Sequence, residues 1–391
     1  MRITFVCNEL PPAPSGGIGW FVSAVAPAIA RKGHDVIVTG VYDAKYDWAL
    51  PGCKVMYVKR RHGRLRRLLR RRGIRRCFSD STLSRLQYRE DCRALKRHIL
   101  TEVRTETPLI VEWPSYQGQC DWSGNGICHV LRIHGATAMP EYSGDPTASR
   151  YRDHEIATAR HIRNWIGVSH WSLDTYHNVV SAQPEQQTVV PNPVNCDMFH
   201  PSSDPAAGRT VLYAGTLCDR KGDNRLAIAA NRFLTEFPDA RLSYIGRHSQ
   251  SRADLIYSLI QPELHDRVDI RDNITQAELA AAMRSAAVFT MPSRGETFGM
   301  VYAEAMASGV PVVAGNKTGI PETVPNGQAG LLVDADDTDA IADAVSSLLR
   351  APEMRRSMGA AGRGVAMEQY SVDACVTRTL DFFEQCLHSS G

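Results

Sequence analysis

Two glutamates separated by seven residues lie in the segment whose residue types and spacing most clearly indicate a binding site. Glu296 and Glu304 lie within residues 291–313, MPSRGETFGMVYAEAMASGVPVV. This segment predicts a strand, a loop and then a helix from about Gly299 to Ser308. A helix N-terminus beside a glycine offers free backbone N–H groups and a partial positive charge. The arrangement predicts an anion site suited to a diphosphate, which glycine allows to approach closely.

The two carboxylates have different predicted places in this unit. Glu296 lies in the loop at the mouth of the site, and Glu304 lies about a turn and a half into the helix. From there the Glu304 carboxylate can accept hydrogen bonds from two vicinal hydroxyls, such as those of a ribose. The alternative is an ordinary strand–helix unit with two solvated glutamates, and the spacing alone does not separate these interpretations.

A basic pair follows an earlier predicted strand. Residues 213–222 are YAGTLCDRKG, which places Arg220 and Lys221 at the start of the next predicted helix. Two fixed cations beside a helix N-terminus would neutralise a leaving diphosphate. The alternative is an exposed basic pair without a ligand.

The pattern P-S-x-x-E-x-F-G-x-x-x-x-E-A-M-A-x-G-x-P-V-V in residues 292–313 resembles the signature of glycosyltransferase family 4. The similarity continues through residues 318–332 (TGIPETVPNGQAGLL) and extends more weakly over nearly the whole chain. The family contains retaining enzymes of the two-domain GT-B fold with an E-x7-E motif. The resemblance implies that Glu296 contacts hydroxyls of the donor hexose and that Glu304 holds the ribose. It also implies donor-binding positions at Phe298, Gly299, Met300 and Val301, the first three through amides that meet the diphosphate.

The same resemblance extends to the basic pair. The family pattern G-R-x-x-x-x-K-G matches at Gly215 and Lys221, but Thr216 stands where the arginine is expected. The resemblance therefore leaves one phosphate contact without an assigned residue, and Arg220 is the candidate to replace the missing arginine. The next glycine turn of the family, near the nucleotide base, corresponds here to Gly246 and Arg247.

Candidates in the first half of the chain follow predicted strands. Residues 11–22 (PPAPSGGIGWFV) join the first predicted strand to the first predicted helix, with a glycine-rich turn expected at 15–19. The resemblance places Gly16 and Gly17 near the donor phosphate and the acceptor. It also places His134 near the donor hexose and the reacting centre, although a lone histidine at a strand end is more often structural. Two further residues are candidates for lining the acceptor side: Glu112 and Ser169.

Short β-branched runs alternate with helical stretches along the whole chain, which predicts parallel sheets covered on both faces. We expect an α/β, GT-B protein with two Rossmann-like, doubly wound domains that face an interdomain cleft. The domains are predicted at 1–203 and 208–370, joined by residues 201–209 (PSSDPAAGR), and a last helix in 371–391 crosses back to the first domain. Predicted strands are 2–7, 35–41, 54–59, 109–113, 128–133, 165–168 and 188–190, then 210–214, 241–245, 268–271, 287–291, 311–314 and 330–333.

The cysteine and aspartate patterns could suggest a metal site, but each has a simpler interpretation. None of the ten cysteines has C-x-x-C spacing, so free thiols in a reducing compartment are expected. Residues 334–336 and 337–339 both have the D-x-D pattern of metal sites in other glycosyltransferases. They precede a predicted helix, where aspartate is an ordinary N-cap. We predict no metal and no cofactor; the nucleotide sugar is a co-substrate.

Charge is distributed unevenly. The first 200 residues carry 27 Lys/Arg and 18 Asp/Glu, whereas the remainder carries 18 and 24. Eleven of the cations lie in residues 59–76, KRRHGRLRRLLRRRGIRR. This segment has three interpretations: a solvated or acidic-acceptor-facing segment, nucleic-acid binding, and adhesion to an anionic membrane surface. The absence of interleaved aromatic residues disfavours nucleic acid, and polybasic segments bind anionic leaflets. We expect a cytoplasmic protein without a transmembrane helix or secretory signal, with peripheral membrane contact as one candidate property.

These observations predict a retaining, metal-independent hexosyltransferase that uses a nucleoside diphosphate sugar, with UDP favoured. The acceptor hydroxyl belongs to a glycan, a lipid-linked compound or a small molecule, as in cell-envelope polysaccharide, lipid-linked glycan or glycoside synthesis. The predicted catalytic residues are His134, Lys221 and Glu296. The alternatives are another GT-B enzyme, such as a sugar-nucleotide epimerase or a phosphorylase, and a non-catalytic protein that binds sugar nucleotides or lipids.

Overall fold

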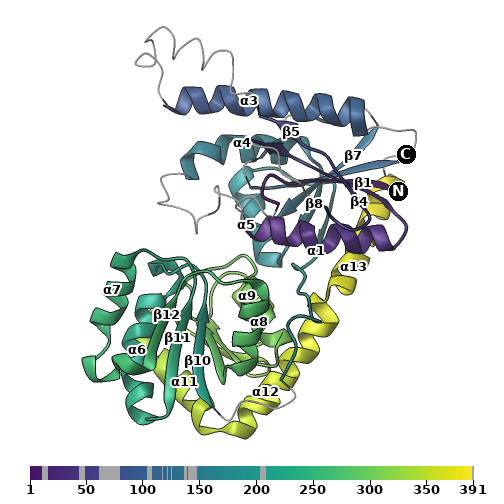
Figure 1. Cartoon of the computed structure of the whole chain (residues 1–391). Helices are drawn as coiled ribbons and strands as arrows, with labels where there is room; N and C mark the ends of the chain where they lie inside the picture. Colours follow the sequence, from purple (N-terminus) through teal and green to yellow (C-terminus); the bar gives the residue numbers. More distant parts are fainter. Residues whose placement is uncertain are drawn as a thin grey trace. The chain divides into compact units, whose positions relative to one another are not determined.

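The computed structural model describes residues 1–10, 16–43, 49–60, 80–103, 108–116, 118–120, 122–124, 126–135, 139, 148–202 and 208–389. Most of the basic segment 59–76, for which membrane adhesion was considered, lies outside these residues. The chain divides into two units, Met1–Val190 with Cys375–Gly391, and Pro191–Ala374. Each unit is built on its own parallel sheet (Figure 1).

The sheet of the first unit has seven strands in the order β4-β2-β1-β6-β7-β8-β9, and every neighbouring pair is parallel. A separate parallel pair joins β3 to β5. The bounds are β1 (Arg2–Val6), β2 (Asp35–Thr39), β3 (Val41–Tyr42), β4 (Cys53–Val55), β5 (Val58–Lys59), β6 (Leu109–Pro114), β7 (Ile127–Ile133), β8 (Asn164–Gly167) and β9 (Gln186–Val189).

Helices cover both faces of this sheet (Figure 1). They are α1 (Gly17–Arg31), α3 (Asp80–His98), α4 (Ala148–His161), α5 (His170–Val180) and the C-terminal part of α13 (Val372–Ser389). One large apolar core contains side chains of α3, α4 and α5 packed against the strands. The strands contribute the fully buried Trp113 of β6 and Trp165 of β8. Burial of such large side chains is the main stabilising term of the unit.

The second unit contains a six-stranded parallel sheet in the order β12-β11-β10-β13-β14-β15. This is the doubly wound order, in which successive strands are added on one side of β10 up to β12 and then on its other side from β13 onward. Ligands of such sheets bind beyond the carboxyl ends of the strands at that point. The bounds are β10 (Arg209–Ala214), β11 (Ala240–Ile245), β12 (Val268–Arg271), β13 (Val288–Met291), β14 (Val312–Gly315) and β15 (Gly330–Val333).

The helices of the second unit also form two layers (Figure 1). Helices α6 and α11 pack on each other with α7 beside α6, and α9 packs on α12. The strands between them are apolar on both faces, as expected for a covered parallel sheet. The bounds are α6 (Asp223–Glu236), α7 (Gln250–Leu259), α8 (Gln276–Ser285), α9 (Met300–Ala307), α10 (Ile320–Thr323), α11 (Thr338–Arg350) and α12 (Pro352–Val365).

Two details differ from the sequence-based expectation. The predicted strand 54–59 is two strands, because β4 pairs with β2 whereas β5 pairs with β3. Residues 191–202 group with the second unit. They do so because the Val194 N–H donates to the Tyr370 carbonyl at 2.7 Å and Arg363 donates to the carbonyls of Cys196 and Phe199.

Candidate active site

Three polar side chains converge on the carboxylate of Glu296, which follows β13. Its Oε1 lies 3.3 Å from Arg220 Nη1 and 3.4 Å from Lys221 Nζ, and it accepts a hydrogen bond from the Ser293 hydroxyl at 3.2 Å. The Glu296 side chain is 15% exposed and that of Lys221 is 19% exposed. Two cations therefore share one carboxylate in a half-buried position, where charge interactions are stronger than in water.

Glycine allows the backbone to approach closely where β10 ends. A Cβ on Gly246 would lie 2.0 Å from the Gly215 carbonyl oxygen, so a residue with a side chain does not fit at position 246. The Gly215 N–H donates to the Ile245 carbonyl and the Leu217 N–H donates to the Arg247 carbonyl. These contacts fix the turn that carries the two cations.

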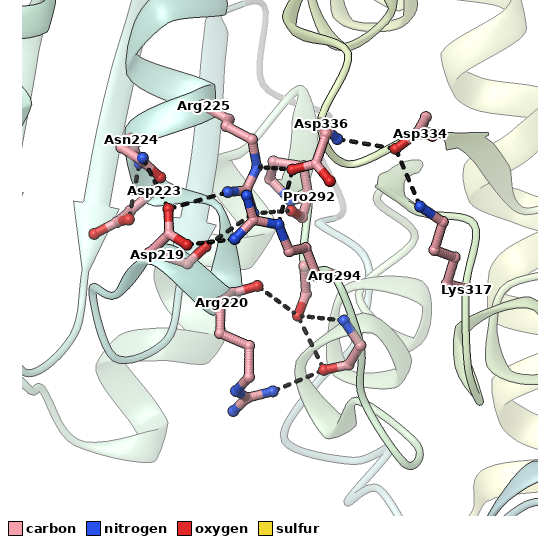
Figure 2. Close-up of polar contacts among 12 residues, drawn as sticks. Asp219, Arg220, Asp223, Asn224, Arg225, Pro292, Arg294, Lys317, Asp334 and Asp336 are labelled. Carbon is pink, nitrogen blue, oxygen red and sulfur yellow. Dashed lines mark hydrogen bonds and ion pairs between the residues drawn. The ribbon is translucent and has the colours of Figure 1, made fainter. Parts of the chain in front are cut away.

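An ion-pair network joins this turn to the loop after β13 (Figure 2). Arg294 pairs with Asp219 and with Asp336, the latter at 2.8 Å. The Arg225 side chain, only 7% exposed, also pairs with both aspartates and donates to the Asp219 carbonyl at 2.8 Å. The backbones are joined as well, because the Arg294 N–H donates to the Arg220 carbonyl at 2.9 Å.

The N-terminus of α9 opens at Gly299, where the backbone adopts the left-handed conformation with φ of 83°. A Cβ at this position would lie 2.4 Å from the Tyr302 ring, so only glycine fits. Tyr302 is fully buried and its hydroxyl donates to the Met291 carbonyl at 2.8 Å. Met300 and Val301 form the first turn of α9, whose N-terminus carries the positive end of the helix dipole.

The two glutamates have very different environments. Glu304 lies inside α9 and is only 5% exposed. Burial raises the pKa of its carboxyl to about 8, because desolvation disfavours the charged form. Glu296, by contrast, has cationic partners. The sequence spacing predicted both positions relative to α9 but not this difference in burial.

Three other predicted donor-binding residues have different environments. Phe298 is buried against Tyr370, with ring centroids 5.2 Å apart, so its side chain belongs to the core. The Thr216 carbonyl accepts from the Tyr213 hydroxyl at 3.1 Å. Arg247 is exposed at the end of the Gly246 turn. The structure thus brings Arg220, not Thr216, to Glu296.

At the start of α1, a carboxylate of the chain itself occupies the glycine turn. The Gly16 N–H donates to Glu9 Oε2 at 3.1 Å, and Gly17 is the first helical residue. Burial raises the pKa of Glu9, and the hydrogen bonds from backbone N–H groups oppose that shift. His134 packs edge-on against Phe21, with ring centroids 4.7 Å apart.

Two predicted acceptor-side residues are buried and make structural contacts. Glu112 is 4% exposed and accepts two hydrogen bonds from Arg132, which is itself fully buried and also donates to the Thr379 hydroxyl. Ser169 is the N-cap of α5 and forms a capping box with Ser172. Both side chains therefore make contacts within the first unit, and their acceptor-side role stays a prediction.

The D-x-D segments also divide into separate roles. Asp337 is the N-cap of α11, with the Ala340 N–H donating to its carboxylate at 2.9 Å, as predicted. Asp336 instead pairs with arginines of the network, and Asp334 accepts from the Asp336 N–H and from Lys317 (Figure 2). In the described part of the chain, no three His, Cys, Asp or Glu residues are grouped to hold a metal ion.

Sequence reasoning missed Ser293 and Thr318 as parts of this site. Ser293 is in the recognised pattern, but its role depends on a buried hydroxyl that reaches Glu296. Thr318 lies 22 residues beyond Glu296 and bonds to its backbone. No local pattern predicts a contact of this kind, because it depends on how β13 and β14 are paired.

Comparisons with known proteins agree with this geometry. Residues 208–351, which lie within the second unit, match the family model of glycosyl transferases group 1. Over these residues the chain is similar to glycosyl transferases group 1. It is 27% identical over 297 residues to alpha-maltose-1-phosphate synthase of Mycolicibacterium smegmatis, covering 66% of this chain and 73% of that protein. It is 33% identical over 214 residues to a GDP-mannose-dependent alpha-(1-6)-phosphatidylinositol monomannoside mannosyltransferase of Mycobacterium tuberculosis, covering 49% and 54%.

Solved structures support the fold of the whole chain. Sucrose-phosphate synthase from Thermosynechococcus elongatus aligns over 100% of both chains with a TM-score of 0.78 and 23% identity. Anabaena HepE in complex with UDP-glucose aligns over 98% of this chain and 100% of its own, with a TM-score of 0.69 and 16% identity. The prediction of two parallel-sheet α/β domains of GT-B type is confirmed. Apart from alpha-maltose-1-phosphate synthase, the curated relatives are matched over only about half their length.

The helices that the structure describes include none with the length and apolar character needed to cross a membrane.

Proposed function

We propose that this protein is a glycosyltransferase that moves a hexosyl group from a nucleoside diphosphate sugar to an acceptor hydroxyl with retention of configuration. The observation that carries the proposal is the convergence of Arg220 and Lys221 on Glu296, beside the N-terminus of α9. This convergence lies at the strand-order reversal of the second sheet, where such folds bind ligands. Cations and amide groups suit a diphosphate, and a carboxylate acceptor suits sugar hydroxyls.

Each group has a distinct task in this proposal. Lys221 and the amides at the start of α9 bind the diphosphate, and Arg220 provides the cation that Thr216 cannot. Glu304 accepts hydrogen bonds from the ribose hydroxyls, and Glu296 does so from the hexose hydroxyls. His134, Gly16 and Gly17 belong to the first unit, and the roles that the family resemblance implies for them stay predictions.

The proposed step follows from these charges. The bond from the anomeric carbon to the diphosphate oxygen breaks, and its electron pair leaves with the diphosphate. The acceptor oxygen bonds to the anomeric carbon on the same face of the sugar, and the departing phosphate takes the acceptor proton. Lys221 and Arg220 stabilise the charge that develops on the diphosphate, so the step does not require a divalent metal.

The substrate classes are the finer part of the proposal. We favour a UDP-sugar donor; HepE was solved with UDP-glucose, whereas the mycobacterial relative is named as GDP-mannose-dependent. Relatives are named for acting on phosphatidylinositol monomannoside and on inositol 3-phosphate. A lipid-linked or phosphorylated polyol acceptor is therefore the class to test first, before free glycans.

The test is a panel of nucleotide sugars, including UDP-glucose, UDP-N-acetylglucosamine and GDP-mannose. The protein is screened first by thermal shift and then by release of nucleoside diphosphate with candidate acceptors. We expect release that depends on the acceptor and a product with the donor's anomeric configuration. Donor epimerisation without an acceptor would identify an epimerase instead. Binding of donors without any turnover would identify a non-catalytic sugar-nucleotide-binding protein.

A further inference from the structure

Thr318 has a backbone conformation that its side chain disfavours. Its φ is 64°, in the left-handed region, where β-branched residues are rare. Among the described residues, one other non-glycine residue has a positive φ: Ser181, which closes α5 as its C-cap, where this conformation is common. Thr318 closes no helix. Strain of this kind persists only where the surrounding structure over-determines it, and it clusters at functional sites.

The contacts of Thr318 explain what holds it there. Its Oγ1 accepts a hydrogen bond from the Glu296 N–H at 2.9 Å. The hydroxyl proton is directed to the Glu296 carbonyl at 2.9 Å or to the Lys317 carbonyl at 2.6 Å. The next residue, Gly319, donates to the same Glu296 carbonyl at 3.0 Å. The backbone of Glu296 is therefore bonded on both its N–H and its carbonyl side by one turn.

Shape adds a second constraint. A Cβ on Gly295 would lie 3.0 Å from the γ-methyl of Thr318, so this methyl packs against the residue just before Glu296. At its other end, the Glu296 carboxylate is held by Ser293, Arg220 and Lys221. The backbone and the carboxylate of Glu296 are thus fixed by different groups, and Thr318 supplies the backbone part.

We propose that Thr318 is a positioning residue that orients Glu296 toward the donor hexose. This inference rests on the proposed function of the same site. A hydrogen-bonding carboxylate must be held within a few tenths of an ångström to discriminate in the transition state, so its supporting contacts affect turnover. The nucleoside diphosphate is bound by other groups, so its affinity should not depend on Thr318.

Three substitutions separate the hydroxyl, the methyl and the backbone strain. Thr318→Val keeps the shape but leaves the Glu296 N–H without its acceptor. Thr318→Ser keeps the hydroxyl and removes the methyl. Thr318→Gly removes the hydroxyl and also relieves the left-handed strain, so it loses the hydroxyl without depending on a strained backbone. Thr235→Val, which removes an exposed hydroxyl on α6, is the matched control.

The measurements are kcat with the best donor of the panel, the Kd of UDP or GDP, whichever nucleotide that donor carries, and the melting temperature. We expect Thr318→Val and Thr318→Gly to lower kcat by roughly 10- to 100-fold with the nucleotide Kd unchanged. Thr318→Ser should restore most of the turnover, and Thr235→Val should match wild type. A merely structural role would lower kcat and the melting temperature together and would spare Thr318→Gly.

Wild-type turnover in both Thr318→Val and Thr318→Gly would overturn the inference while leaving the proposed function intact. An equal loss in Thr318→Ser and Thr318→Val would also overturn it, because the hydroxyl would then not matter. If the wild-type protein itself releases no nucleotide from any donor, it is the proposed function that fails.

Discussion

Among single residues, the balance of charge around Glu296 suits the proposed binding of a diphosphate. Lys221 and Arg220 face one carboxylate, which leaves positive charge available for a diphosphate. Both cations are partly shielded from water, so their interaction with a ligand is weakened less by solvent than at an open surface. The same cations are then well placed to stabilise the leaving group.

The first prediction concerns Lys221. Lys221→Ala should reduce turnover by about 100- to 1,000-fold, the usual cost of losing one preorganised group that stabilises developing charge. Steady-state release of nucleoside diphosphate measures this. Lys54→Ala, an exposed lysine of the first unit, is the control for the same chemical change. Near-normal turnover of Lys221→Ala would remove this lysine from the mechanism.

The second prediction concerns the pH dependence of stability that Glu304 causes. Its pKa in the folded protein is about 8, against an ordinary value of 4.5. The folded state therefore binds this proton more tightly than the unfolded state, and stability falls as the pH rises between these two values. Glu304→Gln cannot ionise. Its melting temperature should be higher than that of wild type at about pH 8 and equal to it near pH 4. Thermal melts over about pH 4 to 9 measure this difference.

The same variant should bind the donor less tightly than wild type, although its stability is higher. The ribose hydroxyls lose a carboxylate acceptor, so Glu304→Gln should weaken nucleotide binding by roughly 1–3 kcal/mol. Calorimetric titration with the nucleoside diphosphate measures the difference. A variant that is more stable and binds equally well would contradict the role given to Glu304.

Much of this residue-level site could be predicted from the sequence, and the limits have a physical cause. The positions of Glu296, Glu304 and Lys221 follow from short-range spacing within strand–turn–helix units. The contacts of Glu296 with Thr318 and Ser293 depend on side-chain orientation and on strand pairing, which spacing does not contain. Spacing also did not predict the contacts of Glu112 and Ser169, because a polar residue at a strand end can belong to a buried ion pair or cap a helix.

Between elements, the ion-pair network holds the turn after β10 against the loop after β13. Arg225 of α6 is its most buried member and reaches backbone carbonyls of both segments, Asp219 at 2.8 Å and Pro292 at 3.4 Å. The segments that carry Lys221 and Glu296 are therefore fixed relative to each other by side chains that lie outside the proposed ligand contacts (Figure 2).

The third prediction tests this arrangement. Arg225→Met keeps the apolar stem but leaves the Asp219 carbonyl without its strongest partner. We expect a loss of roughly 1–3 kcal/mol in unfolding free energy of the second unit. We also expect weaker nucleotide binding, because the two segments separate. Chemical denaturation and titration measure both effects.

The control lies on the same helix. Arg232→Met removes an arginine that is 51% exposed and pairs with Asp343 on the surface. Such pairs contribute about 0–1 kcal/mol, so this variant should be close to wild type in both assays. Equal behaviour of the two variants would show that the network does not position the site.

Elements themselves were predicted well where the apolar pattern is strong. The helix expected from about Gly299 to Ser308 is Met300–Ala307, and the strand expected at 330–333 is β15 (Gly330–Val333). The segment 54–59 was wrong as a single strand, because its two halves pair with different partners. The capping role expected of both D-x-D segments holds at Asp337 but not at Asp336, whose carboxylate is used by Arg294.

Over the whole molecule, the C-terminal helix completes the core of the first unit. Residues 375–391 group with Met1–Val190, and the side chains of Phe382 and Phe383 are buried there. Arg132 of β7 joins Glu112 of β6 to Thr379 of α13. The first unit is therefore assembled from both ends of the chain. The sequence predicted a returning last helix, but not the buried ion pair to which it binds.

The fourth prediction is that Arg132→Met strongly destabilises the first unit. Glu112 would remain buried without its cation, which typically costs about 3–5 kcal/mol. The double variant Arg132→Met with Glu112→Leu removes both charges and should recover much of that stability. Equilibrium denaturation monitored by tryptophan fluorescence reports on this unit, since Trp113 and Trp165 lie in its core. A single variant as stable as the double variant would contradict the account.

The most direct test of the central claim is an experimental structure of the protein with the nucleoside diphosphate of its accepted donor. The account predicts the ribose on the Glu304 carboxylate and the diphosphate over the N-terminus of α9, within reach of Lys221 and Arg220. A nucleotide bound elsewhere, or one that contacts neither Lys221 nor Glu304, would contradict it.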